Sequence, residues 1–236
     1  IRRQRQMCIR DRDCILFYRL GDFYEMFYDD AKIASKELEL TLTGRDCGQA
    51  ERAPMCGVPF HSCEGYIARL VAKGYKVAIC EQTEDPATAK GLVKRDIIRV
   101  ITPGTVMESS MLDEGRNNYI CCMFSENKKI GLCFCDISTG ELCATEISGS
   151  DSVNSLTSQL ASYNPREILI GGDIVKIKSL PAFIKSKLSA GVEMLRDESF
   201  DNKLCTDTVN MQFGEEMQCI CLLYTSPSPR DLSTSR

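Results

Sequence analysis

The spacing of apolar residues in the first half of the chain predicts strands that alternate with helices. Residues 14–19 are a short apolar and aromatic run, which is typical of a strand. Beyond a Gly-Asp pair, apolar side chains recur every three or four residues, at Phe27, Ala31, Ala34 and Leu38. This period predicts a helix that begins at about Glu25.

The other features of this half are, in chain order, an expected strand at 40–43, a segment at 54–60 punctuated by Pro and Gly, an expected helix at 63–73 capped by Gly74, and expected strands at 75–82 and 96–102. Strands that alternate with helices predict an α/β (α+β) domain with a mixed sheet, which we assign to residues 13–107. The polar stretch at 108–118 is expected to be a linker.

A different pattern follows the linker. Strand-like runs joined by short turns, at 119–124, 130–137 and 141–147, predict a β-meander. A helix at 152–162, a strand at 167–170 and a helix at 183–188 are expected after it. A meander followed by alternating helices and strands resembles a ribonuclease-H-like layout, which we assign to residues 119–221.

The two ends of the chain differ from the rest. Residues 1–12 contain five arginines and no apolar period, and residues 222–236 are rich in Ser and Pro. Both segments resemble translated adapter or vector sequence, so we expect non-native tails and a natural polypeptide that begins upstream and continues further. The alternative is a basic DNA-binding arm at one end and a disordered tail at the other.

Composition narrows the class of protein without pointing to nucleic acid. No apolar run approaches the roughly 20 residues that span a bilayer, and no signal-peptide pattern is present, which favours the cytoplasm and no membrane. The 14 cysteines lack zinc-site spacing and are expected to be buried in a reducing compartment, with a redox role as the alternative. The net charge of -4 gives no sign of DNA binding, because phosphate contacts need a basic face.

The stretch from Gly21 to Phe27 has two interpretations when it is read alone. Phe23 and Glu25 stand where a strand is expected to lead into a helix. The first interpretation places Phe23 in the core and Glu25 in the first turn of the helix, where acids are common. The second treats both as functional, because Phe23 lies before the helical stripe and is not needed by it.

Six blocks resemble, in the same order, the mismatch-binding and connector domains of the MutS family over residues 13–222. They are FYRLGDFYEMF at 17–27, MCGVPFH at 55–61, VAICEQ at 77–82, DPATAKG at 85–91, RVITPGT at 99–105 and DISTG at 136–140. The resemblance implies a bacterial, nucleoid-associated protein of DNA mismatch repair.

The resemblance gives Phe23 and Glu25 a role. The family's Phe-x-Glu enters the minor groove, where the Phe stacks on a mispaired or unpaired base and the Glu hydrogen-bonds to that base. Apolar wedges of this kind kink DNA by about 20–90°. Because faulty pairing lowers the cost of unstacking, a mismatch is recognised mainly through its low deformation energy. The carboxylate near phosphates also disfavours intact duplex.

Backbone binding requires cations. Lys90 is a candidate from the basic stretch at 90–99, and the resemblance places Arg45 and Arg95 along the DNA. The alternative is a solvated charged face. His61 is interpreted as structural. No catalytic residue and no metal ligand is expected.

The resemblance also implies partners and cofactors. These are double-stranded DNA with mismatches or small loops, MutL through the connector, and a second copy in a full-length homodimer, whereas this chain alone is expected to be a monomer. The ATP and Mg²⁺ of the full-length family protein are not expected here, because no GxxxxGK[ST] motif occurs.

Two other functions remain open. A ribonuclease-H-like fold could carry a metal-dependent nuclease, with Asp136, Glu141 and Asp173 as candidates, although the acids of a strand-turn-strand at 136–141 need not converge. The chain could also be an interaction module that docks MutL without reading DNA. The presence of both Phe23 and Glu25 argues against that module.

Overall fold

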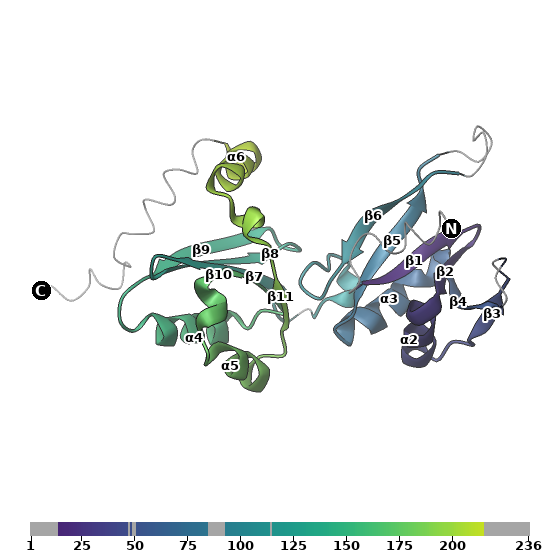
Figure 1. Cartoon of the computed structure of the whole chain (residues 1–236), viewed down its shortest axis with the longest axis horizontal. Helices are drawn as coiled ribbons and strands as arrows, with labels where there is room; N and C mark the ends of the chain where they lie inside the picture. The colour runs from purple at the N-terminus through teal and green to yellow at the C-terminus, as the bar shows by residue number, and fades with distance from the viewer. Residues whose placement is uncertain (1–13, 47, 49–50, 85–92, 114, 215–236) are drawn as a thin grey trace, which may run out of the picture. The chain divides into compact units, whose positions relative to one another are not determined.

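The computed structural model describes residues 14–46, 48, 51–84, 93–113 and 115–214 (Figure 1). They form two compact units, and each unit is described by itself: the first comprises the described residues up to Asn118 together with Ile137–Thr139, and the second the remaining described residues from Tyr119. Residues 108–118, expected to be a linker, group with the first unit. Lys90 and the two segments expected to be non-native tails lie outside the described residues.

The first unit contains β1 (Cys14–Leu20), β2 (Phe23–Phe27), α2 (Tyr28–Leu38), β3 (Thr43–Arg45), β4 (Ala53–Pro59), the 3-10 helix η1 (Phe60–Ser62), α3 (Cys63–Ala72), β5 (Lys76–Gln82), β6 (Arg95–Ile101) and the 3-10 helix η2 (Ser109–Met111). Its strands form one mixed sheet in the order β3-β4-β2-β1-β5-β6. Strand β1 is central, since it pairs antiparallel with β2 and parallel with β5.

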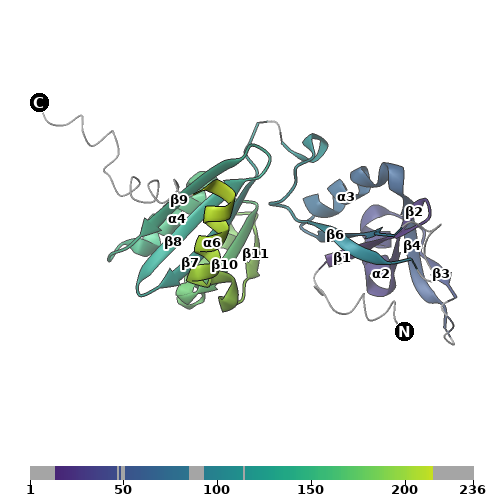
Figure 2. The same cartoon turned by 90° about the horizontal axis from the view of Figure 1, so that it is seen from above.

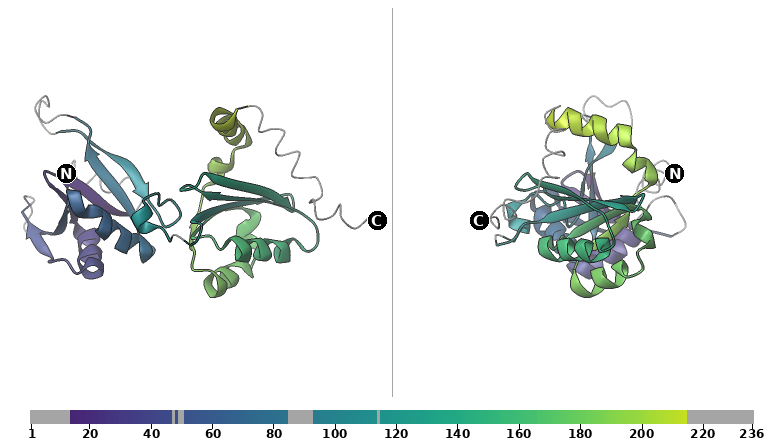
Figure 3. Two further views of the ribbon diagram at one scale, coloured as in Figure 1. Left: turned by 180° about the vertical axis from the view of Figure 1, so that it is seen from behind. Right: turned by 90° about the vertical axis from the view of Figure 1, so that its left-hand side faces the viewer.

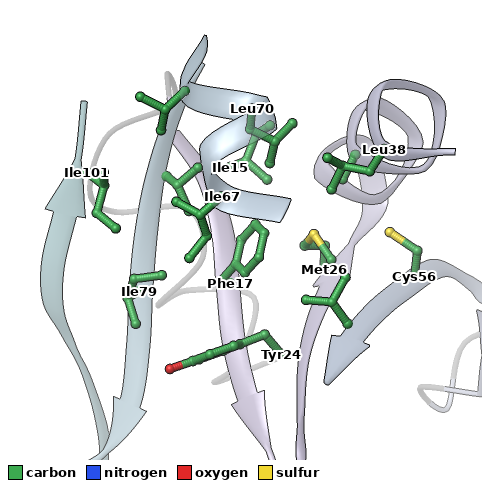
Figure 4. Packing of buried hydrophobic residues seen from close by; sticks show 14 of the residues in the cluster. Ile15, Phe17, Tyr24, Met26, Leu38, Cys56, Ile67, Leu70, Ile79 and Ile101 are labelled. Carbon is green, nitrogen blue, oxygen red and sulfur yellow. The ribbon is translucent and has the colours of Figure 1, made fainter. Parts of the chain in front are cut away.

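One face of this sheet packs against α2 and α3. Phe17 and Met26 point from the strands toward Leu38 of α2 and Leu70 of α3, the Tyr24 ring lies across the strands beside Phe17, and all five side chains are buried (Figure 4). Successive side chains of a strand point to opposite faces. The residues that alternate with this buried set therefore lie on the other face of the sheet.

The strand β2 corrects the expected helix start. Residues 23–27 alternate between more and less exposed positions, which is the two-residue period of a strand, and β2 pairs with β1 and with β4. The helix begins at Tyr28, not at Glu25, and Tyr28 has a positive φ of 53° at the junction. The prediction failed because Phe27 fits both the strand period and the helical stripe.

The Pro- and Gly-rich segment at 54–60, for which no strand was predicted, is mostly the strand β4. Its prolines are tolerated near the strand ends, and pairing with β2 and β3 outweighs the local preference for a loop. The strand expected at 40–43 lies instead at Thr43–Arg45. The predictions of β1, α3, β5 and β6 are confirmed to within about a residue at most ends.

The second unit contains β7 (Tyr119–Glu126), β8 (Lys129–Asp136), β9 (Glu141–Ile147), α4 (Ser152–Tyr163), β10 (Glu167–Gly172), the 3-10 helix η3 (Asp173–Lys176), α5 (Leu180–Lys187), β11 (Gly191–Met194), the 3-10 helix η4 (Asp197–Phe200) and α6 (Asn202–Phe213). The strand order is β11-β10-β7-β8-β9. The expected meander is confirmed as β7-β8-β9, and β10 and β11 add parallel strands beside it.

The helices of the second unit lie on both faces of its sheet. Helices α4 and α5 lie on one face, and α6 lies on the opposite face (Figures 2 and 3). The core forms on the α4 and α5 side, around Met123, Leu132, Phe134 and Leu160. Helix α5 begins earlier than expected, and β11 and α6 were not predicted. The fold class, α/β with mixed sheets, is confirmed in both units.

Within the described ranges, no helix is long and apolar enough to cross a membrane.

Candidate nucleic-acid interface

Phe23 stands directly after the tight turn that joins β1 and β2. The turn is Gly21-Asp22, and Gly21 has a φ of 58°. A positive φ at the first of two turn residues is the requirement of a type II′ hairpin, and glycine meets it without strain. The next residue, Phe23, is 47% exposed, whereas Tyr24 is only 6% exposed. The hairpin therefore presents a large apolar side chain to solvent.

This turn lies at the end of the sheet where several strands meet. Phe23 pairs with Leu20 of β1 and with Pro59 of β4, so β2 begins where these two strands end. Strand β5 runs parallel to β1 and ends at Gln82, which pairs with Arg95 at the start of β6. The topology thus places Arg95 at the same end of the sheet as Phe23.

The carbonyl groups of the turn accept hydrogen bonds from outside it. Nε of Arg19 donates to the Gly21 carbonyl at 2.5 Å, and the backbone N–H of Phe60 donates to the Asp22 carbonyl at 2.9 Å. The Arg19 guanidinium also lies over the Phe60 ring, 3.5 Å from its centroid. None of this was predicted, because it depends on η1 lying beside the hairpin.

A second set of contacts lies behind Arg19. Its Nη1 is 3.6 Å from Oε1 of Glu81, and the hydroxyl of Tyr24 donates to the same carboxylate. Burial, followed by the hydrogen bond to Glu81, raises the pKa of Tyr24 well above its usual value. The phenol therefore remains a donor, and the Glu81 carboxylate holds Arg19 and Tyr24 together.

Glu25 and Arg45, which were predicted separately, form an ion pair. The Glu25 carboxylate, 17% exposed, accepts a hydrogen bond from Nη1 of Arg45, which is 40% exposed. The two residues come from β2 and β3, with β4 between them. Gly57 of β4 pairs with Glu25, and a Cβ there would lie 3.6 Å from the Glu25 Cγ and 3.3 Å from the Tyr24 carbonyl oxygen. Glycine at this position leaves room for the Glu25 side chain.

The Arg95 side chain contacts a backbone carbonyl and an aromatic ring of β1. Its Nε donates to the Arg19 carbonyl at 3.2 Å, and its guanidinium lies 5.3 Å from the centroid of the Tyr18 ring. The predicted cations Arg45 and Arg95 are thus both held by neighbours in the free protein. His61, interpreted as structural, packs edge-on against the Phe60 ring at a centroid distance of 5.9 Å.

The acids of the nuclease alternative are brought together more closely than expected. Asp136 and Glu141 are directly paired across β8 and β9, because the turn between them closes a hairpin. Asp136 is 1% exposed, however, and Asp173 is paired with Lys176 at 2.6 Å. Among the residues that the structure describes, no group of His, Cys, Asp or Glu could hold a metal ion.

The cysteines in the described part of the chain are all free thiols. Burial raises the pKa of Cys56, Cys80 and Cys133 to about 11. A thiol with a raised pKa holds little thiolate at neutral pH and reacts slowly. These residues fit the interpretation as small apolar groups.

The sequence matches two family models over most of its length. Residues 2–110 match MutS domain I, and residues 118–220 match MutS domain II. The chain belongs to the MutS family. Its domain I carries the exposed Phe23 and the Glu25–Arg45 pair described above.

Bacterial relatives agree with this assignment. Proteins named DNA mismatch repair protein MutS from Acetivibrio thermocellus and Ruminiclostridium cellulolyticum are 50% and 53% identical over 204 and 205 residues. These alignments cover 86% and 87% of this chain, and 23% and 24% of the relatives. The relative from Clostridium tetani is 48% identical over 90% of this chain and 24% of its own length. The chain thus spans about a quarter of the length of these MutS proteins.

Proposed function

We propose that this chain recognises mispaired or unpaired bases in duplex DNA, with Phe23 as the wedge and Glu25 as the hydrogen-bonding partner of the displaced base. The observation that carries the proposal is the 47% exposure of Phe23 at the tip of a tight hairpin, in a domain that matches MutS domain I. Stacking a base on such a ring contributes about 1–3 kcal/mol.

That energy is of the same size as the cost of unstacking a base step, which is a few kcal/mol. In an intact duplex the wedge must also break a well-formed pair, so insertion is unfavourable. At a mismatch the pair is already weak, and insertion becomes favourable. Phe23 thereby distinguishes the two duplexes through DNA deformation, without reading a sequence.

Glu25 adds to this discrimination through its charge. In the free protein its carboxylate is neutralised by Arg45. On DNA, Arg45 turns to a phosphate and Glu25 forms a hydrogen bond with the displaced base. On an intact duplex no displaced base is present, so the released carboxylate meets only phosphates and is repelled. Arg95 and Lys90 supply further backbone contacts in this proposal.

The remaining family properties belong to the longer protein. MutL docking through domain II, a homodimer, and ATP hydrolysis with Mg²⁺ are proposed for a full-length MutS that contains this chain. The matched models cover only domains I and II.

The test measures the affinity of this chain for duplexes that differ only in one G·T or G·C pair. The wild-type chain should bind the G·T duplex more tightly, and F23A should bind both duplexes equally. Equal binding of both duplexes by the wild type would overturn the proposal for this chain. Binding of MutL by a chain that ignores mismatches would instead support the interaction module.

A further inference from the structure

A wedge at the tip of a hairpin can kink DNA only if its base does not yield. Unstacking a base step requires a few kcal/mol. The sheet supports strands β1 and β2, but the Gly21-Asp22 turn lies beyond their last pair, Leu20 and Phe23, and depends on contacts of its own. Whatever holds this turn determines how much force Phe23 transmits to the DNA.

Two residues outside the turn hold both of its carbonyl groups. Arg19 of β1 donates from Nε to Gly21 at 2.5 Å, and Phe60 of η1 donates from its backbone N–H to Asp22 at 2.9 Å. The two donors lie 41 positions apart in the sequence (60 − 19), on different elements. The turn is thus fixed to the end of β4 as well as to its own hairpin.

The same two residues also hold each other. The Arg19 guanidinium carbon lies 3.5 Å from the centroid of the Phe60 ring, which is the distance of a close cation–π stack. Oε1 of Glu81 in β5 lies 3.6 Å from Nη1 of Arg19 and accepts a hydrogen bond from the hydroxyl of Tyr24. Movement of the turn would have to break the stack and separate Arg19 from β5.

We propose that Arg19 and Phe60 form a clamp that positions Phe23 for insertion into a mismatch. They are positioning residues, since they contact the backbone of the turn. The inference rests on the proposed function of Phe23. An arginine is required because its planar guanidinium can stack on a ring while Nε–H donates in the plane, and a lysine cannot do both.

The first measurement needs no DNA. Amide hydrogen exchange at Phe60, followed by NMR on the 236-residue chain, reports the bond to Asp22. R19K keeps the charge and should raise this exchange rate at least about tenfold, because a charged hydrogen bond and a stack are lost. F60L keeps an apolar side chain and the backbone donor, and should raise the exchange rate of the same amide because the ring that stacks on Arg19 is removed.

The matched control is Arg69 of α3. Its guanidinium donates to the carbonyls of Leu38 and Glu37, at 3.3 and 3.5 Å, so R69K also removes an arginine-to-carbonyl contact in the same unit. R69K should leave the exchange rate of Phe60 unchanged. An unchanged rate in R19K, or an equal rise in R69K, would overturn the clamp.

The second measurement is the ratio of the dissociation constants for matched and G·T duplexes. R19K and F60L should lower this ratio toward one and leave the affinity for the matched duplex unchanged, since the net charge is preserved. R69K should keep the wild-type ratio. Faster exchange with an unchanged ratio would overturn the positioning role. If the wild-type ratio is one, the proposed function fails, and the exchange rates still decide whether the clamp exists.

Discussion

The ion pair between Glu25 and Arg45 makes an electrostatic prediction that separates the roles of the two residues. The Arg45 side chain is 40% exposed, so solvent screens the pair. A pair of this kind contributes about 0.2–1 kcal/mol to folding, and the exposure places it in the lower half of that range. E25Q and R45Q should each lower the free energy of unfolding by less than about 0.5 kcal/mol. Differences in DNA binding between these variants therefore do not reflect unfolding.

The effect on DNA binding follows from Coulomb's law. A unit charge about 7 Å from a phosphate interacts by roughly 0.6 kcal/mol in water, which is about threefold in affinity at low salt. At about 0.1 M salt the Debye length of ~10 Å reduces this to less than twofold. R45Q removes a cation from the phosphates, so both duplexes should bind about threefold more weakly at low salt.

E25Q has the opposite effect on one of the two duplexes. The matched duplex should bind about threefold more tightly at low salt, because repulsion is removed and Arg45 is free to contact a phosphate. The G·T duplex should gain less or lose affinity, since the hydrogen bond to the base is weakened. The double variant should return close to the wild-type affinity for the matched duplex.

Titrations monitored by fluorescence anisotropy at two salt concentrations would measure these affinities. The control is the pair of Arg99 and Glu108 in the same unit, which has a distance of 2.5 Å and similar exposures of 36% and 24%. R99Q should change the affinities for the matched and the G·T duplex by the same factor, and the same should hold for E108Q. Equal effects of E25Q on the two duplexes would refute the base contact, and an unchanged affinity in R45Q would refute the electrostatic coupling.

Three further predictions concern stability. F17A should lower the free energy of unfolding by about 3–5 kcal/mol in chemical denaturation, because Phe17 is 0% exposed, whereas F23A should lower it by less than about 1 kcal/mol. Burial raises the pKa of Asp30 above its ordinary 3.8, so the folded state retains a proton that the unfolded chain releases. The free energy of unfolding should therefore fall as pH rises from 3.8 through the folded-state pKa. D30N keeps an acceptor for the Leu16 N–H, and in this variant the decline should disappear from a pH series of unfolding curves. G172A should destabilise the second unit by roughly 2 kcal/mol or more in thermal unfolding, since φ is 60° and the added Cβ would lie 2.5 Å from a carbonyl oxygen.

Elements with a single unambiguous period were predicted correctly from the sequence, and those with conflicting signals were not. The meander and α3 have such periods, and their ranges agree with the structure. At Phe27 the strand and helix periods overlap, and the helix was extended backward over β2. No strand was predicted at β4, because two prolines and a glycine are uncommon in strands. Pairing with β2 on one side and β3 on the other makes the segment a strand.

The candidate site shows the same division between local and long-range information. The exposure of Phe23 agrees with the interpretation that it is not needed by the helical stripe. Its partners could not be predicted, because the contact of Glu25 with Arg45 depends on the order β3-β4-β2. The stack of Arg19 on Phe60 likewise depends on β4 ending beside the hairpin turn. Local patterns in a single sequence do not reveal which strands are neighbours in the sheet.

The proposed function requires a chain with a net charge of -4 to distinguish DNA duplexes, and paired cations of the first unit bear on this requirement. Arg45 is neutralised by Glu25 and Arg99 by Glu108, so neither projects an uncompensated charge in the free protein. Attraction to an intact phosphate backbone is thereby reduced, since each charge that meets DNA must first leave its partner. A strongly basic face would bind every duplex and dilute the contribution of the wedge. In the proposed function, compensated charges therefore make the deformation energy at Phe23 a larger share of the total binding free energy.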